Sequence, residues 1–243
     1  LPVATPGEGR LSEFDAVNLS TALHRIARSR DGQQAVSDPA FRALWQGVCG
    51  AVPDFRAQGL ANTTWSCARL SLGDPPLLQP MSRAVVASMR EFRFEGLAKT
   101  AWAFATLAFC DGPLMDAIAA RALALDRDKM GSPEMSSLAW AFAKLGVLAE
   151  PLMASIASAA VPSIATFSAQ DLANLVWSFA TLALPEAPLM DAIAAASLTK
   201  IGNFAAQGLV NTAWAFATLG FANKPLLDAL AGGSVASIAG MPP

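Results

Sequence analysis

A tryptophan recurs at a nearly constant interval along most of the 243-residue chain. Successive members are 37 or 38 residues apart, and the series runs Trp65, Trp102, Trp140, Trp177 and Trp214. A leucine follows each tryptophan by five residues, a proline follows it by eleven, and a phenylalanine or methionine precedes it by ten. A fixed period of this length indicates a repeat protein, in which each repeat packs mainly on its two neighbours.

Each repeat predicts two helices. Apolar residues around the tryptophan recur at helical spacing, and the pattern breaks six residues later, where Gly146 and Gly220 suit a helix C-terminus. The proline then opens a second helix, where its missing N–H is harmless. Ser168 and Asp171 have the spacing of an N-terminal capping box. We therefore expect an all-α fold, a right-handed-type α-solenoid of about six helix-turn-helix repeats of 37–38 residues.

The two ends of this array differ in charge. Residues 1–54 form a divergent N-terminal capping repeat, with His24 in the place of the tryptophan and several charged side chains nearby. Residues 55–243 form five repeats of one continuous solenoid. The last predicted helix, from Pro225 to Gly240, carries only Asp228 as a charge, so we expect more chain or a partner to cover this end.

Composition argues against an enzyme and against a resident cofactor or metal. The chain has one histidine, His24, and three cysteines without metal-ligand spacing, which we expect to be buried thiols. Asp116, Asp191 and Asp228 recur with the repeat, which makes them surface residues rather than a paired acid and base.

Residues 204–223 are uncharged over a length that could span a bilayer. Several polar side chains lie in the first half of this run, and the same sequence pattern recurs in other repeats. We expect the protein to be peripheral to any membrane rather than to span one.

One polar stripe follows the first helix of every repeat. It combines the positions seven and three residues before the tryptophan with those one and four residues after it, which share a helical face. The candidate binding residues on it are Gln58, Asn62, Arg69, Glu95, Lys99, Ser137, Lys144, Gln170, Asn174, Gln207 and Asn211. Two interpretations stay open, because the amides could pair with base edges or a peptide backbone, or could bond neighbouring helices and fix the stacking.

The segments 170–182 and 207–220 resemble the octotricopeptide repeat family of organellar helical-repeat proteins. Their amino-acid sequences are especially similar to dinoflagellate and algal versions of this repeat. The resemblance covers residues 55–240 well. It implies an organellar protein, in the chloroplast or alternatively the mitochondrion. Family members typically bind organellar RNA, whereas some similar helical-repeat proteins are structural subunits of large assemblies.

The distribution of basic residues favours a structural subunit over an RNA-binding protein. Beyond Gly131 only three lysines face six acidic residues, so an RNA strand along that half would find few cations. We also expect the tryptophans and phenylalanines to lie on the core face, which leaves no aromatic side chains for base stacking. The sequence thus favours a non-catalytic scaffold that docks as a structural or assembly subunit on protein subunits of a large organellar complex, with a photosystem or ribosome as candidates. Sequence-specific binding of single-stranded RNA is the alternative.

Overall fold

The computed structural model describes residues 14–239, and the side chains of this range except those of residue 75 and residues 234–239. These residues form thirteen α-helices and five short 3₁₀ helices, and the described part of the chain contains no strand. The predicted all-α class is confirmed.

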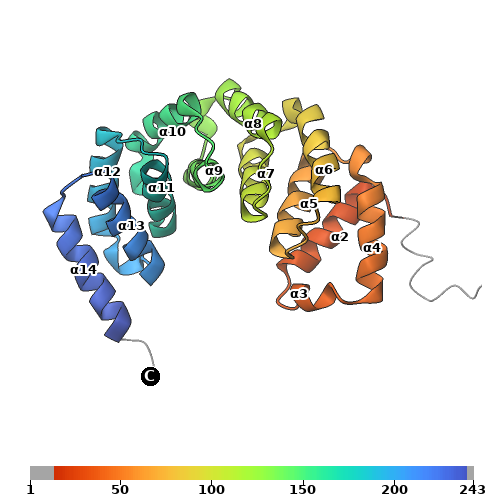
Figure 1. Cartoon of the computed structure of the whole chain (residues 1–243), viewed down its shortest axis with the longest axis horizontal. Coiled ribbons are helices and arrows are strands. Elements are labelled where there is room, and N and C mark those ends of the chain that lie inside the picture. Colours follow the sequence, from red (N-terminus) through yellow and green to blue (C-terminus); the bar gives the residue numbers. More distant parts are fainter. Residues whose placement is uncertain (1–13, 240–243) are drawn as a thin grey trace, which may run out of the picture. The chain divides into compact units, whose positions relative to one another are not determined.

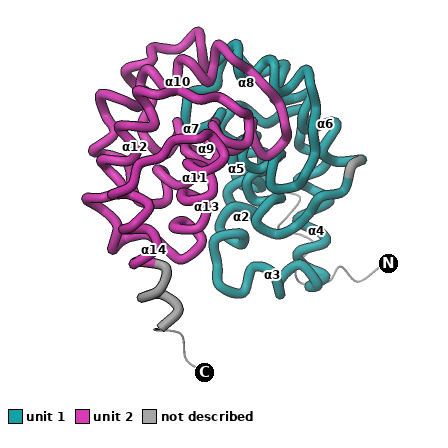
Figure 2. The backbone as a smooth tube through the Cα atoms, turned by 60° about the vertical axis from the view of Figure 1, so that its left-hand side comes forward, with its two compact units in different colours: residues 1–121 teal, residues 122–243 magenta. Residues whose placement is uncertain are grey.

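The chain divides into two compact units, residues 1–121 and residues 122–243 (Figure 2). In the first unit α5 packs between α2 and α7, while α4 and α6 pack on α2 and α5, respectively (Figure 1). The helices of this unit are α2 (Ala16–Arg28), α3 (Gly32–Ala35), α4 (Pro39–Gly50), α5 (Ala57–Arg69), α6 (Pro75–Ala87) and α7 (Phe94–Thr106); α8 (Gly112–Ala124) crosses the division.

The second unit contains two parallel rows of helices. The first helices α9, α11 and α13 pack side by side, and the second helices α10, α12 and α14 form the other row. Their bounds are α9 (Ser132–Lys144), α10 (Glu150–Ser163), α11 (Ala169–Thr181), α12 (Ala187–Thr199), α13 (Ala206–Thr218) and α14 (Lys224–Ala239). Stacked helical hairpins of this kind are an α-solenoid, as predicted. The sense of its superhelix and its continuity across the two units stay predictions.

Each first helix of the five regular repeats ends in the same hydrogen-bonded cap. The N–H seven residues after the tryptophan donates to the carbonyl two residues after it, as in Leu72 to Cys67 at 2.8 Å and Val147 to Phe142 at 2.9 Å. The residue six positions after the tryptophan has a positive φ. The sequence predicted this helix C-terminus at Gly146 and Gly220. Three repeats place a non-glycine residue there, with φ between 53° and 56°: Ser71, Ala108 and Ala183.

The helix N-termini also follow the sequence. The periodic proline lies in the first turn of the second helices, for example in α10 and α12. Ser168 and Asp171 form the predicted capping box of α11.

The core is built from phenylalanine rather than tryptophan. Two residues after each of the last four tryptophans, the side chains of Phe104, Phe142, Phe179 and Phe216 are fully buried. The tryptophans are only half-buried, and Trp214 is 46% exposed. The expectation that both aromatic types lie on the core face is therefore wrong. Two residues correspond to about 200° of helix rotation, so a helix that buries the phenylalanine turns its tryptophan toward the opposite side.

Two of the three cysteines also differ from expectation. Cys67 is buried, and burial raises the pKa of its thiol to about 12. Cys49 and Cys110 are exposed. Within residues 14–239, no helix combines the length and the apolar character needed to cross a bilayer.

Candidate functional site

One of the four positions of the predicted polar stripe differs from expectation. The residues directly after the tryptophans are buried, and Ser66 and Ser178 donate to the carbonyls of Asn62 and Asn174, each at 2.6 Å. The half-exposed tryptophan takes that place on the outer face. We call this face, at seven and three residues before the tryptophan, the tryptophan itself and four residues after it, the tryptophan stripe.

All eleven candidate residues from the sequence lie on the tryptophan stripe, and none of them is fully buried. In the first unit the stripe contains Gln58, Asn62, Trp65 and Arg69 of α5, and Glu95, Lys99, Trp102 and Thr106 of α7. In the second unit it contains Ser137, Trp140 and Lys144 of α9, then Gln170, Asn174 and Trp177 of α11, and Gln207, Asn211 and Trp214 of α13.

Aromatic and cationic side chains meet in the first unit. The rings of His24 on α2 and Trp65 on α5 have centroids 4.9 Å apart, and the Arg69 guanidinium lies 5.7 Å from the Trp65 ring centroid. Partial burial lowers the pKa of His24, and the charges of Lys99 and Arg28 lower it further. The charges of Lys99 on α7 and Arg28 on α2 thus lie close enough to act on His24.

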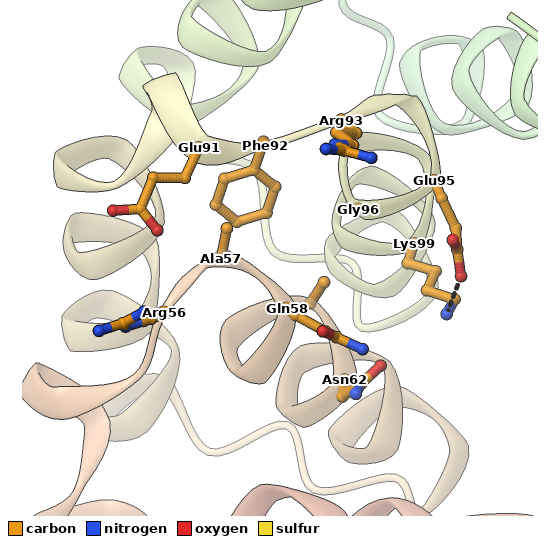
Figure 3. A pocket seen from close by; sticks show the side chains of 11 residues that line it. Arg56, Ala57, Gln58, Asn62, Glu91, Phe92, Arg93, Glu95, Gly96 and Lys99 are labelled. Carbon is orange, nitrogen blue, oxygen red and sulfur yellow. Dashed lines mark hydrogen bonds and ion pairs between the residues drawn. The ribbon is translucent and has the colours of Figure 1, made fainter. Parts of the chain in front are cut away.

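A cavity of about 440 Å³ opens beside this cluster, between the N-terminal halves of α5 and α7 (Figure 3). Its lining combines cations, amides and two carboxylates: Arg56, Gln58, Asn62, Glu91, Arg93, Glu95 and Lys99. Figure 3 shows Gln58 and Asn62 projecting from α5 on the side of Lys99. Lys99 donates to Glu95 at 2.6 Å, and this bond lowers the pKa of the Glu95 carboxyl.

Two arginines of this lining occupy the N-cap positions of their helices. Arg56 precedes α5 and Arg93 precedes α7, and neither helix has a side-chain cap. The first-turn N–H groups lack intrahelical partners, and a helix N-terminus carries a partial positive charge. The guanidinium groups add to that charge, whereas Glu91 and Glu95 reduce it, so the lining combines three cations with two carboxylates.

A second cavity, of about 250 Å³, adjoins the first between α2 and α5. It shares Arg56, Gln58 and Asn62 with the first cavity and continues to Val17 and Thr21 of α2. The two cavities together make a groove across three successive first helices of the first unit.

The second unit offers amides and indoles with fewer cations. Residues 122–243 contain five Lys or Arg against eight Asp or Glu, whereas residues 1–121 contain twelve against eleven. On α11, Gln170 donates to Asn174 of the same helix at 2.8 Å. Among the described residues, neither Asn62 nor Asn211 forms a side-chain hydrogen bond to an adjacent helix. Both interpretations of the polar stripe stay predictions.

The arrangement suits a single-stranded nucleic acid. Indoles that are not fully buried could stack on bases, amides could bond to base edges, and arginines could neutralise phosphates. Within residues 14–239, no group of three or more His, Cys, Asp or Glu side chains is placed to hold a metal ion.

Sequence reasoning missed the exposure of the tryptophans and the two N-cap arginines. Both had a signal in the sequence. Arg56 and Arg93 lie nine residues before their tryptophans, a shared register, and the phenylalanines two residues after four of the tryptophans compete for the same core.

Two overlapping stretches, residues 9–151 and residues 141–241, match the model of a family described as RNA-editing substrate-binding complex 6 protein. No curated protein matches the chain. The two stretches together include every described helix.

Proposed function

Since this chain belongs to the family of the RNA-editing substrate-binding complex 6 protein, we propose that it is a non-catalytic scaffold that holds single-stranded RNA within a protein assembly. The family's name describes its namesake as part of a complex that binds the substrates of RNA editing. For this chain the proposal assigns the same kind of ligand to the tryptophan stripe.

The observation that carries the proposal is the environment of Trp65. The Trp65 side chain is half-buried, with His24 against one part of its ring and Arg69 over it. Contacts with two other side chains reduce the freedom of the indole, so less entropy is lost when a base stacks on it. Stacking of this kind tolerates any base and stabilises a bound strand by about 1–3 kcal/mol per base.

Phosphate contacts come from the groove beside it. Arg56 and Arg93 line the larger cavity from two successive helix N-termini, and Lys99 of α7 lines it as well. Cations that neutralise phosphates release counterions from the nucleic acid, and the resulting affinity falls as salt rises. The first unit therefore supplies most of the electrostatic attraction, while the second adds indoles and amides.

This proposal reverses the order of the two alternatives that the sequence left open. The lack of stacking aromatics argued for docking on a photosystem or ribosome, and the half-exposed tryptophans remove that argument. Neither host enters the proposal, although protein partners remain part of it. The octotricopeptide resemblance and the chloroplast, with the mitochondrion as the alternative, stay predictions.

The test is a filter-binding titration with a single-stranded RNA of about 20 nucleotides, spanning several repeats, at several salt concentrations. The double variant Arg56→Gln/Arg93→Gln removes both N-cap cations. Its salt slope should fall by about two, because each lost phosphate contact reduces the slope by roughly one. Arg83→Gln is the matched control, since Arg83 is exposed on α6 outside the groove. Absence of RNA binding by the unmodified chain, or an equal loss in the control, would overturn the proposal.

A further inference from the structure

One regular repeat carries an ion pair on the tryptophan stripe where most of the others carry amides. The positions seven and three residues before its tryptophan hold Glu95 and Lys99 of α7, and Lys99 Nζ donates to Glu95 Oε1 at 2.6 Å (Figure 3). The same two positions of the other regular repeats hold uncharged residues: Gln58 and Asn62, Pro133 and Ser137, Gln170 and Asn174, and Gln207 and Asn211. The repeat of α7 therefore presents a different surface to a strand that follows the stripe.

Both members of this ion pair line the larger cavity. Its volume of about 440 Å³ lies within the range of pockets that hold small organic ligands, about 300–1,000 Å³. A phosphate is a poor partner for Glu95, because two anions repel each other. Within RNA, only the hydrogen-bond donors of the bases and of the 2′-hydroxyl groups can bond to this carboxylate.

The ion pair fixes which atoms donate and which accept at this site. The bond from Lys99 lowers the pKa of the Glu95 carboxyl, so this group is ionised at neutral pH and only accepts hydrogen bonds. The Lys99 ammonium only donates, and it keeps further N–H groups besides the one bonded to Glu95. An amide offers both a donor and an acceptor and can turn to suit different base edges, whereas this pair cannot.

We infer that the larger cavity is a guanine-selective site for one base of a bound RNA strand, an inference that rests on the proposed function. The Watson–Crick edge of guanine presents an acceptor, O6, and beside it two donors, N1–H and N2–H. Lys99 can donate to O6 while the two carboxylate oxygens of Glu95 accept from N1–H and N2–H, the fork arrangement of a bidentate carboxylate. Arg56 and Arg93 of the same lining can neutralise the neighbouring phosphates.

The other three bases leave part of this ion pair unmatched. Uracil places its O2 acceptor opposite the second carboxylate oxygen, and adenine and cytosine each have one amino group with a ring-nitrogen acceptor beside it. A polar group without a partner in a binding site lowers affinity. The side chain of Glu95 is 71% exposed, and water weakens its hydrogen bonds. We therefore expect guanine to be preferred by at least about fivefold, the lower end for a good bidentate pair.

Inosine tests this inference, because its base keeps the O6 and N1–H of guanine and lacks only the N2 amino group. Fluorescence anisotropy compares two labelled uridine-rich strands of equal length, which carry either guanosine or inosine at regular intervals. The unmodified chain should bind the guanosine strand at least about fivefold more tightly than the inosine strand. Glu95→Gln removes one of the two acceptor oxygens, so the ratio of the two dissociation constants should fall to about one.

Glu186→Gln is the matched control, since Glu186 is exposed at the N-cap of α12 and its substitution removes the same charge outside the stripe. This control should keep the guanosine preference of the unmodified chain. Three results would overturn the inference: equal affinity of the unmodified chain for both strands, an undiminished preference in Glu95→Gln, or loss of the preference in the control.

Free guanosine monophosphate distinguishes a base within a strand from a free nucleotide. It should displace the guanosine strand only at concentrations far above the dissociation constant of that strand, because it lacks the stacking and phosphate contacts of the other nucleotides. Displacement at equal concentrations would assign the cavity to a free nucleotide and overturn the inference. Equal binding of both strands contradicts the guanine site alone, whereas absence of RNA binding contradicts the proposed function as well.

Discussion

Ser136 Oγ donates a hydrogen bond to Asp171 Oδ1 at 2.7 Å and thereby joins α9 to α11. The same register holds Ala61 and Gly96 in the first unit, and Ala173 and Gly208 between α11 and α13, where two small residues meet. In these three pairs of first helices the stacking uses either a close alanine–glycine contact or a part-buried hydrogen bond to a carboxylate.

Loss of this bond should destabilise the second unit. Ser136→Ala leaves Asp171 without its interhelical donor and should lower the free energy of unfolding by about 1.5–3 kcal/mol, the range for a bond to a charged group. Urea denaturation followed by circular dichroism measures it. Ser137→Ala is the control, because Ser137 is half-buried and adjacent but outside this contact. Equal stability of the two variants would contradict the role of the bond.

Glycine and alanine should have opposite effects on stability at the positive-φ position that follows each first helix. Ala183 has a φ of 54°, which an L-residue adopts at a cost, so Ala183→Gly should raise the free energy of unfolding by about 1 kcal/mol. Gly146, with a φ of 67°, should show the reverse when replaced by alanine. A β-carbon at Gly146 meets no atom within 4 Å, which leaves backbone strain as the cause. A shift of the same sign in both variants, measured by thermal unfolding, would contradict this account.

The two aromatic positions of a repeat should differ in their contribution to stability. Phe179→Ala removes a fully buried ring and should cost about 3–5 kcal/mol. Trp177→Ala removes a half-buried ring and should cost clearly less. Chemical denaturation of the two variants measures both losses in the free energy of unfolding. A larger loss for Trp177→Ala would contradict the assignment of the phenylalanine, rather than the tryptophan, to the core.

His24 should make stability depend on pH. Its pKa is lowered from 6.5 in the folded chain, so below about pH 6.5 the unfolded chain binds more protons than the folded one. The contribution of His24 is complete above that pH, and it is lost as the pH falls toward the lowered pKa. His24→Gln should therefore lose less stability than the unmodified chain between about pH 7 and pH 5.5. If the stability of the two proteins changed with pH in the same way, the lowered pKa of His24 would be contradicted.

The periodic residues of the sequence account for the helices, their order and their caps. Each depends on local geometry: proline in the first turn, and the positive φ after the first helix. The direction of the tryptophan could not be obtained in the same way. Trp177 and Phe179 are both large and apolar, and only the packing of α12 and the neighbouring first helices decides which of them is covered. The groove also escaped prediction, because Arg56 and Arg93 lie far apart in sequence and line one cavity only when α5 packs on α7.

The central claim is that single-stranded RNA stacks on the tryptophan stripe, and Trp65→Leu tests it most directly. Leucine keeps an apolar side chain but removes the aromatic face. Fluorescence anisotropy with a labelled single-stranded RNA should show affinity weakened by about 1–3 kcal/mol, which is roughly 5- to 150-fold. Trp45→Leu is the control, since Trp45 is a half-buried tryptophan of α4 outside the stripe. Its affinity should stay unchanged. Equal affinity of the Trp65 variant and the unmodified chain, with helical content preserved, would contradict the claim.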